Sequence, residues 1–162
     1  MYGETLDRIY TRIHRQGQLG RAWSALRGRP SRLRSLAEID ATTVRARHDA
    51  GLRTVRIDEI CGSEGRCHDF DRRFRPLQDH SEHRWLNVAR ARQEGKSLPP
   101  VELVQVGEAY YCLDGHHRIS VPRAFGQPEI EATVTVWQVK GTRTGAERAG
   151  RQQLSLALTL QA

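Results

Sequence analysis

The chain has 162 residues, 38% of them apolar, and a formal net charge of +7, which suits one compact domain with short extensions. No stretch approaches the roughly 18 consecutive apolar residues of a membrane span, and the first ten residues lack the pattern of a signal peptide. Three cysteines without a disulfide-framework spacing are typical of a reducing compartment, so we expect a cytoplasmic protein without a membrane partner.

The basic excess is confined to the first third of the chain. Residues 1–56 hold 12 arginines and 5 acidic residues, whereas residues 57–162 hold 14 basic and 14 acidic residues. Arginine donates paired hydrogen bonds to phosphate, so this third is a candidate DNA-binding surface, although no recognition motif accompanies it. The codon usage of a gene rich in G and C is the alternative explanation.

Apolar residues recur at helical spacing over residues 4–26. Gly17 and Gly20 interrupt the pattern, so we expect one broken helix or two short ones. Trp23 lies on the apolar face and is expected to dock this segment onto the rest of the protein.

A second helix is predicted over residues 33–50, where apolar residues again recur at helical spacing. Gly51 would be its C-cap. Residues 1–51 are therefore predicted to form a basic helical N-terminal extension.

Residues 52–140 are predicted to form one α+β domain with a small mixed sheet. The expected elements are a strand near 52–60, a polar loop over 61–79, a helix over 80–94, two strands within 98–115, a helix over 117–125 and a strand over 130–138. The tail, 141–162, is predicted to start as a loop and to close as a short helix.

The predicted loop over 61–79 is long for a compact domain, and such loops are commonly functional. Four arginines in it are candidates for contacting a phosphate, namely Arg66, Arg72, Arg73 and Arg75. Solvation, or pairing with Asp69 and Asp71, is the alternative for each of them. No zinc spacing is found among the nearby cysteines and histidines, so we predict no metal site there.

The sequence Asp114-Gly115-His116-His117-Arg118 stands at the predicted junction of a strand and a helix. The free N–H groups and the dipole at a helix start favour an anion, and the second histidine and the arginine would add donors. Asp114 is expected to cap the helix, to orient a histidine or to hold a metal ion. An ordinary Asp-Gly turn with surface side chains is the alternative, but the density of donors favours a phosphate site.

Residues Leu98–Trp137 resemble the core of the ParB/sulfiredoxin superfamily, with a strand, a turn, a strand, a short motif ending in arginine, a helix and a final strand. The resemblance implies a nucleotide site, for CTP or ATP with Mg²⁺, at Gly115, His116, His117 and Arg118. Sulfiredoxins carry Gly-Cys-His-Arg there. His116 stands at the position of the reactive cysteine, so sulfiredoxin activity is not expected. Partitioning proteins carry Gly-Glu-Arg-Arg, and the resemblance to them implies a partitioning-type role in association with DNA, with a homodimer as the expected assembly.

Free-serine kinases of the same superfamily carry Asp-Gly-His-Thr-Arg, which matches Asp114, Gly115, His116 and Arg118 most closely. By this resemblance Glu64 would be the general base of a phosphotransferase, and Asp114 and His116 would be catalytic. A ParB-like nuclease is a second enzymatic alternative. An interaction module with an unused phosphate site is the non-enzymatic one.

Pro122 departs from the superfamily pattern, because it falls within the helix that follows the motif. A proline in a helix interior costs about 3 kcal/mol. It costs little if the helix begins as late as Ile119.

Overall fold

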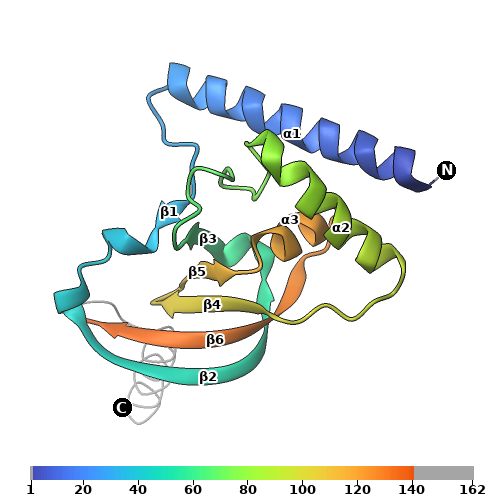
Figure 1. Cartoon of the computed structure of the whole chain (residues 1–162). Coiled ribbons are helices and arrows are strands. Elements are labelled where there is room, and N and C mark those ends of the chain that lie inside the picture. The colour runs from blue at the N-terminus through green and yellow to red at the C-terminus, as the bar shows by residue number, and fades with distance from the viewer. Residues whose placement is uncertain (1, 141–162) are drawn as a thin grey trace, which may run out of the picture.

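The computed structural model describes residues 2–140 and shows one mixed sheet with three α-helices on one side of it (Figure 1). The elements are α1 (Tyr2–Leu26), β1 (Arg34–Ser35), η1 (Leu36–Glu38), η2 (Ala41–Thr43), β2 (Val44–Arg56), η3 (Ile57–Glu59), β3 (Ile60–Ser63), η4 (Asp79–Ser81), α2 (Glu82–Gln93), β4 (Val101–Val106), β5 (Ala109–Asp114), α3 (His116–Ala124) and β6 (Glu129–Val139). The predicted fold class, α+β with a small mixed sheet and a helical N-terminal segment, is confirmed. The predicted helix in the tail lies outside the described residues.

The strand order of the sheet is β1-β3-β5-β4-β6-β2. β3 pairs in parallel with β5, and β4 pairs in parallel with β6, whereas β4 and β5 form an antiparallel hairpin. Because β3 and β5 are parallel neighbours, the segments that follow them leave the same edge of the sheet. This arrangement brings the loop after Ser63 next to the motif after Asp114.

The predicted helix over 33–50 is wrong. This region forms the short helices η1 and η2 and the first half of β2, which pairs with β6 along its length. Most side chains of β2 are exposed on an edge strand, so the apolar alternation that marks a strand is missing from its sequence. Gly51 is not a helix cap: it has φ +70° at a β-bulge, where its N–H donates to Asp49. The predicted boundary after residue 51 falls inside this strand.

The predicted break in the first helix is also wrong, since α1 runs continuously from Tyr2 to Leu26. Gly17 and Gly20 instead allow the helix to lie close to the loop at Arg75 and Pro76. A Cβ at Gly17 would lie 3.2 Å from the carbonyl oxygen of Pro76, and one at Gly20 would lie 2.9 Å from the Arg75 guanidinium. Trp23 does not dock the helix, because it is 57% exposed and lies under the guanidinium of Arg27.

One buried cluster holds α3 to the sheet, and a second holds the three helices together. The larger joins sheet residues such as Val134 to Phe70 of the loop and to Ile119 of α3. The second joins α1, α2 and α3 and includes Tyr10 and Trp85, both of which are buried. Since α3 contributes to both clusters, it is held between the sheet and the outer helices (Figure 1).

None of the helices within residues 2–140 has the length and apolar character that a membrane crossing requires.

Candidate functional site

The site is built on the tight turn between β5 and α3. Gly115 has φ +97°, a left-handed conformation that favours glycine, and it is the N-cap of α3. No side chain caps this end of the helix. The backbone N–H groups of His116, His117 and Arg118 therefore lack both intrahelical partners and a side-chain acceptor. Such an end attracts an anion.

Arg118 holds the turn rather than facing outward. Its Nη1 donates to the carbonyl oxygens of Pro99 and Pro100, at 2.7 and 2.9 Å, and its Nη2 donates to the carboxylate of Asp114. The side chain of Arg118 is only 16% exposed. Asp114 consequently pairs with Arg118 and does not cap α3. The capping role predicted for Asp114 is therefore wrong in this conformation.

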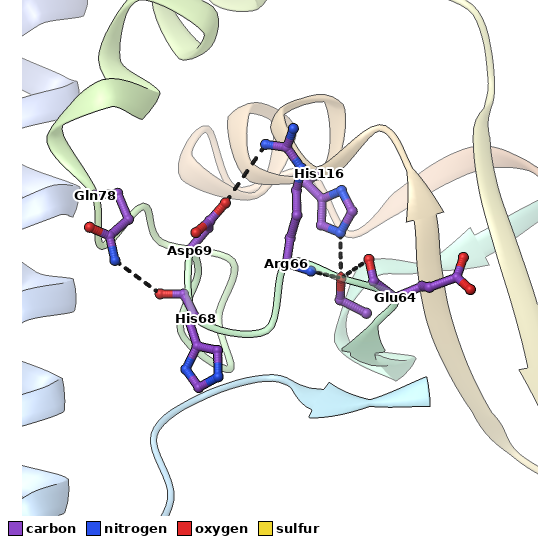
Figure 2. A network of polar contacts seen from close by, with 7 residues as sticks. Glu64, Arg66, His68, Asp69, Gln78 and His116 are labelled. Carbon is purple, nitrogen blue, oxygen red and sulfur yellow. Dashed lines mark hydrogen bonds and ion pairs between the residues drawn. The ribbon is translucent and has the colours of Figure 1, made fainter. Parts of the chain in front are cut away.

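His116 is buried and held by a serine that sequence reasoning missed. Its Nε2 lies 2.6 Å from the Oγ of Ser63 at the end of β3 (Figure 2). Ser63 also accepts a hydrogen bond from the backbone N–H of Arg66 and lies 3.2 Å from the carbonyl oxygen of Glu64. The serine has one proton, so it donates either to His116 or to that carbonyl. In both cases the imidazole is fixed through Nε2 and stacked against Phe70.

Ser63 is fully buried, so no substrate reaches its hydroxyl in this conformation. It is therefore a positioning residue for His116. The sequence signal for it is weak: a serine after a glycine, at the end of a short strand. Only the parallel pairing of β3 with β5 brings it opposite the motif.

Both ring nitrogens of His117 are covered and have no hydrogen-bond partner within the described residues. The ring packs edge-on against Phe70, with centroids 5.2 Å apart. Burial, together with the charges of the nearby Arg66 and Arg84 and against an opposite effect of Asp69, lowers the pKa of His117 to about 4. His117 is thus neutral at pH 7, with both ring nitrogens shielded from solvent.

Arg66 is the charged residue that lowers the pKa of both histidines most strongly. Its side chain extends from the loop after β3 toward the first turn of α3 and lies 3.8 Å from the carboxylate of Asp69 (Figure 2). Burial lowers the pKa of His116 to about 4, with Arg66 and His117 contributing and Asp114 opposing. The structure therefore places one of the four predicted loop arginines at the motif.

The other loop arginines lie elsewhere. Arg75 pairs with Asp71, which is 3% exposed and also accepts from the backbone N–H groups of Arg73 and Arg75. Arg72 is exposed. These contacts order the turn between Asp71 and Arg75 and direct Arg75 toward α1.

Glu64 lies beside the motif, because its N–H donates to the carbonyl oxygen of Cys112 in β5. Its side chain is exposed, and its carboxylate points away from His116 (Figure 2). The structure thus brings the backbone of Glu64 to the predicted site but gives its carboxylate no contact with the histidines.

Cys112 is fully buried, and burial raises the pKa of its thiol well above the usual range, so it stays protonated. Within residues 2–140 no three histidine, cysteine, aspartate or glutamate side chains are grouped closely enough to hold a metal ion.

Pro122 lies inside α3, since the helix begins at His116 and not at Ile119. It has no N–H to donate to the carbonyl of Arg118. The helix continues only to Ala124, and the carbonyl of Pro122 accepts from Gln127 at 2.9 Å. The irregularity therefore falls at the carboxyl end of α3, away from its first turn.

Comparisons with known proteins give one structural likeness. No family model matches the sequence, and no match was found among curated proteins. The crystal structure of sulfiredoxin from Arabidopsis thaliana is similar with a TM-score of 0.40 and 14% identity, over 64% of this chain and 96% of that one.

Proposed function

We propose that this chain binds a phosphate-bearing ligand of the nucleoside triphosphate class, CTP or ATP, at the amino end of α3. The observation that carries the proposal is the uncapped first turn of this helix, which starts from a left-handed glycine. Three backbone N–H groups there need an acceptor, and the helix dipole favours an anionic one.

The local charge supports the same ligand. Arg66 lowers the pKa of both His116 and His117, which means that its positive charge is felt at the helix mouth. A phosphate dianion would offset this field and accept hydrogen bonds from the backbone and from Arg66.

The residues would then act in different ways. The N–H groups of His116 and His117 and the guanidinium of Arg66 would bind phosphate, and Gly115 would allow its close approach. Arg118 would act indirectly, by holding the segment at Pro99 and Pro100 against the turn. Mg²⁺ would arrive with the triphosphate, with Asp114, which is 68% exposed, as a carboxylate within reach of the turn.

Substitution of Arg66 and of Arg118 should separate binding from stability. We expect Arg66→Gln to weaken CTP or ATP binding about tenfold, because one charge-assisted contact is lost, with an unchanged melting temperature. We expect Arg118→Ala to lower the free energy of unfolding by about 2 kcal/mol even without ligand, because three hydrogen bonds that anchor the turn are removed.

The measurements are calorimetric titrations with CTP, ATP and ADP in Mg²⁺, and urea denaturation of each variant. Arg45→Gln on the exposed edge strand β2 is the matched control. Binding that is absent with all three nucleotides, or equal in Arg66→Gln and Arg45→Gln, would contradict the proposal. Absence of binding would leave an interaction module as the better description.

A phosphotransferase is the second candidate, because the backbone of Glu64 lies beside the motif. Glu64 directly follows Ser63, at the edge of the sheet where α3 begins, and its carboxylate is exposed to solvent. In such a reaction the hydroxyl oxygen of an acceptor attacks the γ-phosphorus, its proton passes to Glu64, and the bond to the bridging oxygen breaks to release a nucleoside diphosphate.

We expect Glu64→Gln to lower transfer of γ-phosphate to serine about 100-fold or more while leaving nucleotide affinity unchanged, since a general base contributes about that much. Incubation with radiolabelled ATP and serine, followed by separation of the products, measures the transfer. Glu59→Gln, another exposed acidic residue outside the site, is the control. Transfer at the wild-type rate in Glu64→Gln would remove Glu64 as the base, and strand cleavage without transfer would favour the nuclease alternative.

A further inference from the structure

A second basic site lies at the opposite end of α3. A cavity of about 490 Å³ opens between α1, the turn after Asp71 and the carboxyl end of α3. Its polar lining residues are Arg12, Gln16, Arg73, Arg75, Ser120 and Arg123. No acidic residue of the described chain lines it.

Two of these four arginines are already engaged. Arg75 is paired with the buried carboxylate of Asp71, at 2.6 Å, and Arg123 donates to the carbonyl oxygen of Ile57 at 3.3 Å. The guanidinium groups of Arg12 and Arg73 have no ion pair or hydrogen bond within residues 2–140. The cavity therefore carries positive charge that the described chain does not compensate.

The arginines repel one another. Burial lowers the pKa of Arg123, and the charges of Arg73 and Arg75 add to this, while Asp71 and Asp58 oppose it. Arg123 in the last turn stabilises the carboxyl end of α3, because the free carbonyl groups there carry partial negative charge. An anion between the arginines would relieve the remaining repulsion.

The walls of the cavity are held in place by contacts between α1 and the loop. His14 lies 3.0 Å from the carbonyl oxygen of Pro76, and Gln18 donates to that of Leu77 at 2.7 Å. Gly20 leaves room for the guanidinium of Arg75 against the helix. Three elements distant in sequence thus present their arginines to one space before any ligand binds.

We infer that this cavity binds a small phosphorylated ligand, at a site separate from the amino end of α3. Guanidinium groups that converge from three elements suit a tetrahedral phosphate, which accepts hydrogen bonds from several directions, better than a planar carboxylate. The volume lies in the range of small-molecule sites, and Ile13 and Ala124 add apolar lining for the body of the ligand.

Pyrophosphate is the probe for a titration of the full chain, with malonate and a DNA oligonucleotide as comparisons. We expect the double variant Arg12→Gln, Arg73→Gln to bind pyrophosphate at least about tenfold more weakly than wild type, because two unpaired guanidinium groups are lost. Arg21→Gln, on the same helix but outside the cavity, should bind as wild type does. Melting temperatures confirm that each variant is folded, and the single variants Arg12→Gln and Arg73→Gln provide a second measurement.

Arg66→Gln separates this site from the one proposed at α3. Pyrophosphate binding that survives Arg66→Gln and falls in the double variant supports the cavity, whether or not nucleotides bind at the amino end of α3. Binding that falls in Arg66→Gln and is unchanged in the double variant overturns it. Malonate binding as tight as pyrophosphate binding overturns the preference for phosphate. A loss of oligonucleotide binding alone overturns the small ligand in favour of DNA.

Discussion

Acidification from pH 7 to pH 5 is expected to lower the free energy of unfolding by about 2 kcal/mol for each of His116 and His117, and so by about 4 kcal/mol in total. Both imidazoles are neutral in the folded protein, where burial and Arg66 lower their pKa to about 4. In the unfolded chain a histidine has a pKa of about 6.5.

The direction follows from the proton count. Below about pH 6.5 the unfolded chain takes up protons at these histidines while the folded protein does not, so acid favours unfolding. This contribution to stability is fully present above the unfolded pKa and is lost as the pH falls toward about 4. Asp40 and Asp58, whose pKa values hydrogen bonds lower, add to acid sensitivity only below this window.

Urea denaturation at several pH values between 7.5 and 5 measures the effect. His117→Phe keeps an aromatic ring beside Phe70 and removes no hydrogen bond, because the ring nitrogens of His117 have no partner among the described residues. This variant should lose about half of the acid sensitivity. His48→Gln, at an exposed position of β2, should keep all of it. A His117→Phe curve parallel to that of wild type would contradict the assignment.

Gly115→Ala is expected to lower the free energy of unfolding by roughly 3 kcal/mol or more. Two costs add here. A side chain at φ +97° is strained by about 1–3 kcal/mol, and a Cβ would lie 2.6 Å from Cγ1 of Val101, which adds an overpacking cost of about 1–3 kcal/mol. Because Gly115 starts α3, the same change should disturb the proposed phosphate site.

Two further variants separate these costs in equilibrium denaturation. Gly126→Ala has a comparable left-handed φ of +77° but no heavy atom within 4 Å of the new Cβ, so it should show the backbone strain alone. Val101→Ala in the background of Gly115→Ala should recover the overpacking cost, as a double-mutant cycle reveals. Equal losses in Gly115→Ala and Gly126→Ala would show that Val101 yields without cost.

The amino-acid sequence was sufficient to predict the elements in which buried and exposed residues follow one another with a regular period. The alternation in β6 and the hairpin of β4 and β5 predicted these strands, and the spacing in α2 predicted its helix. The position of Asp114 to Arg118 at a strand-to-helix junction was also predictable, because an Asp-Gly turn is a local property of the chain.

Other features depend on contacts between distant segments. β2 forms because it pairs with β6, and its exposed side chains leave no period to recognise. α1 is continuous. Its glycines lie where the helix closely approaches the loop at Arg75 and Pro76, and they do not mark a break in the helix. Arg118 has the residue type of a phosphate ligand, yet its neighbours at Pro99 and Pro100 give it an anchoring role.

By itself, therefore, the sequence determined the fold class, the main strands of the sheet and the place of the motif, since each follows from local periodicity or local turn chemistry. Only the tertiary structure decided which donors face a ligand. It placed Ser63 and Arg66 at the histidines through the parallel pairing of β3 and β5, and it gathered Arg12, Arg73 and Arg123 around one cavity. Such groupings depend on long-range packing, which no local pattern of residues encodes.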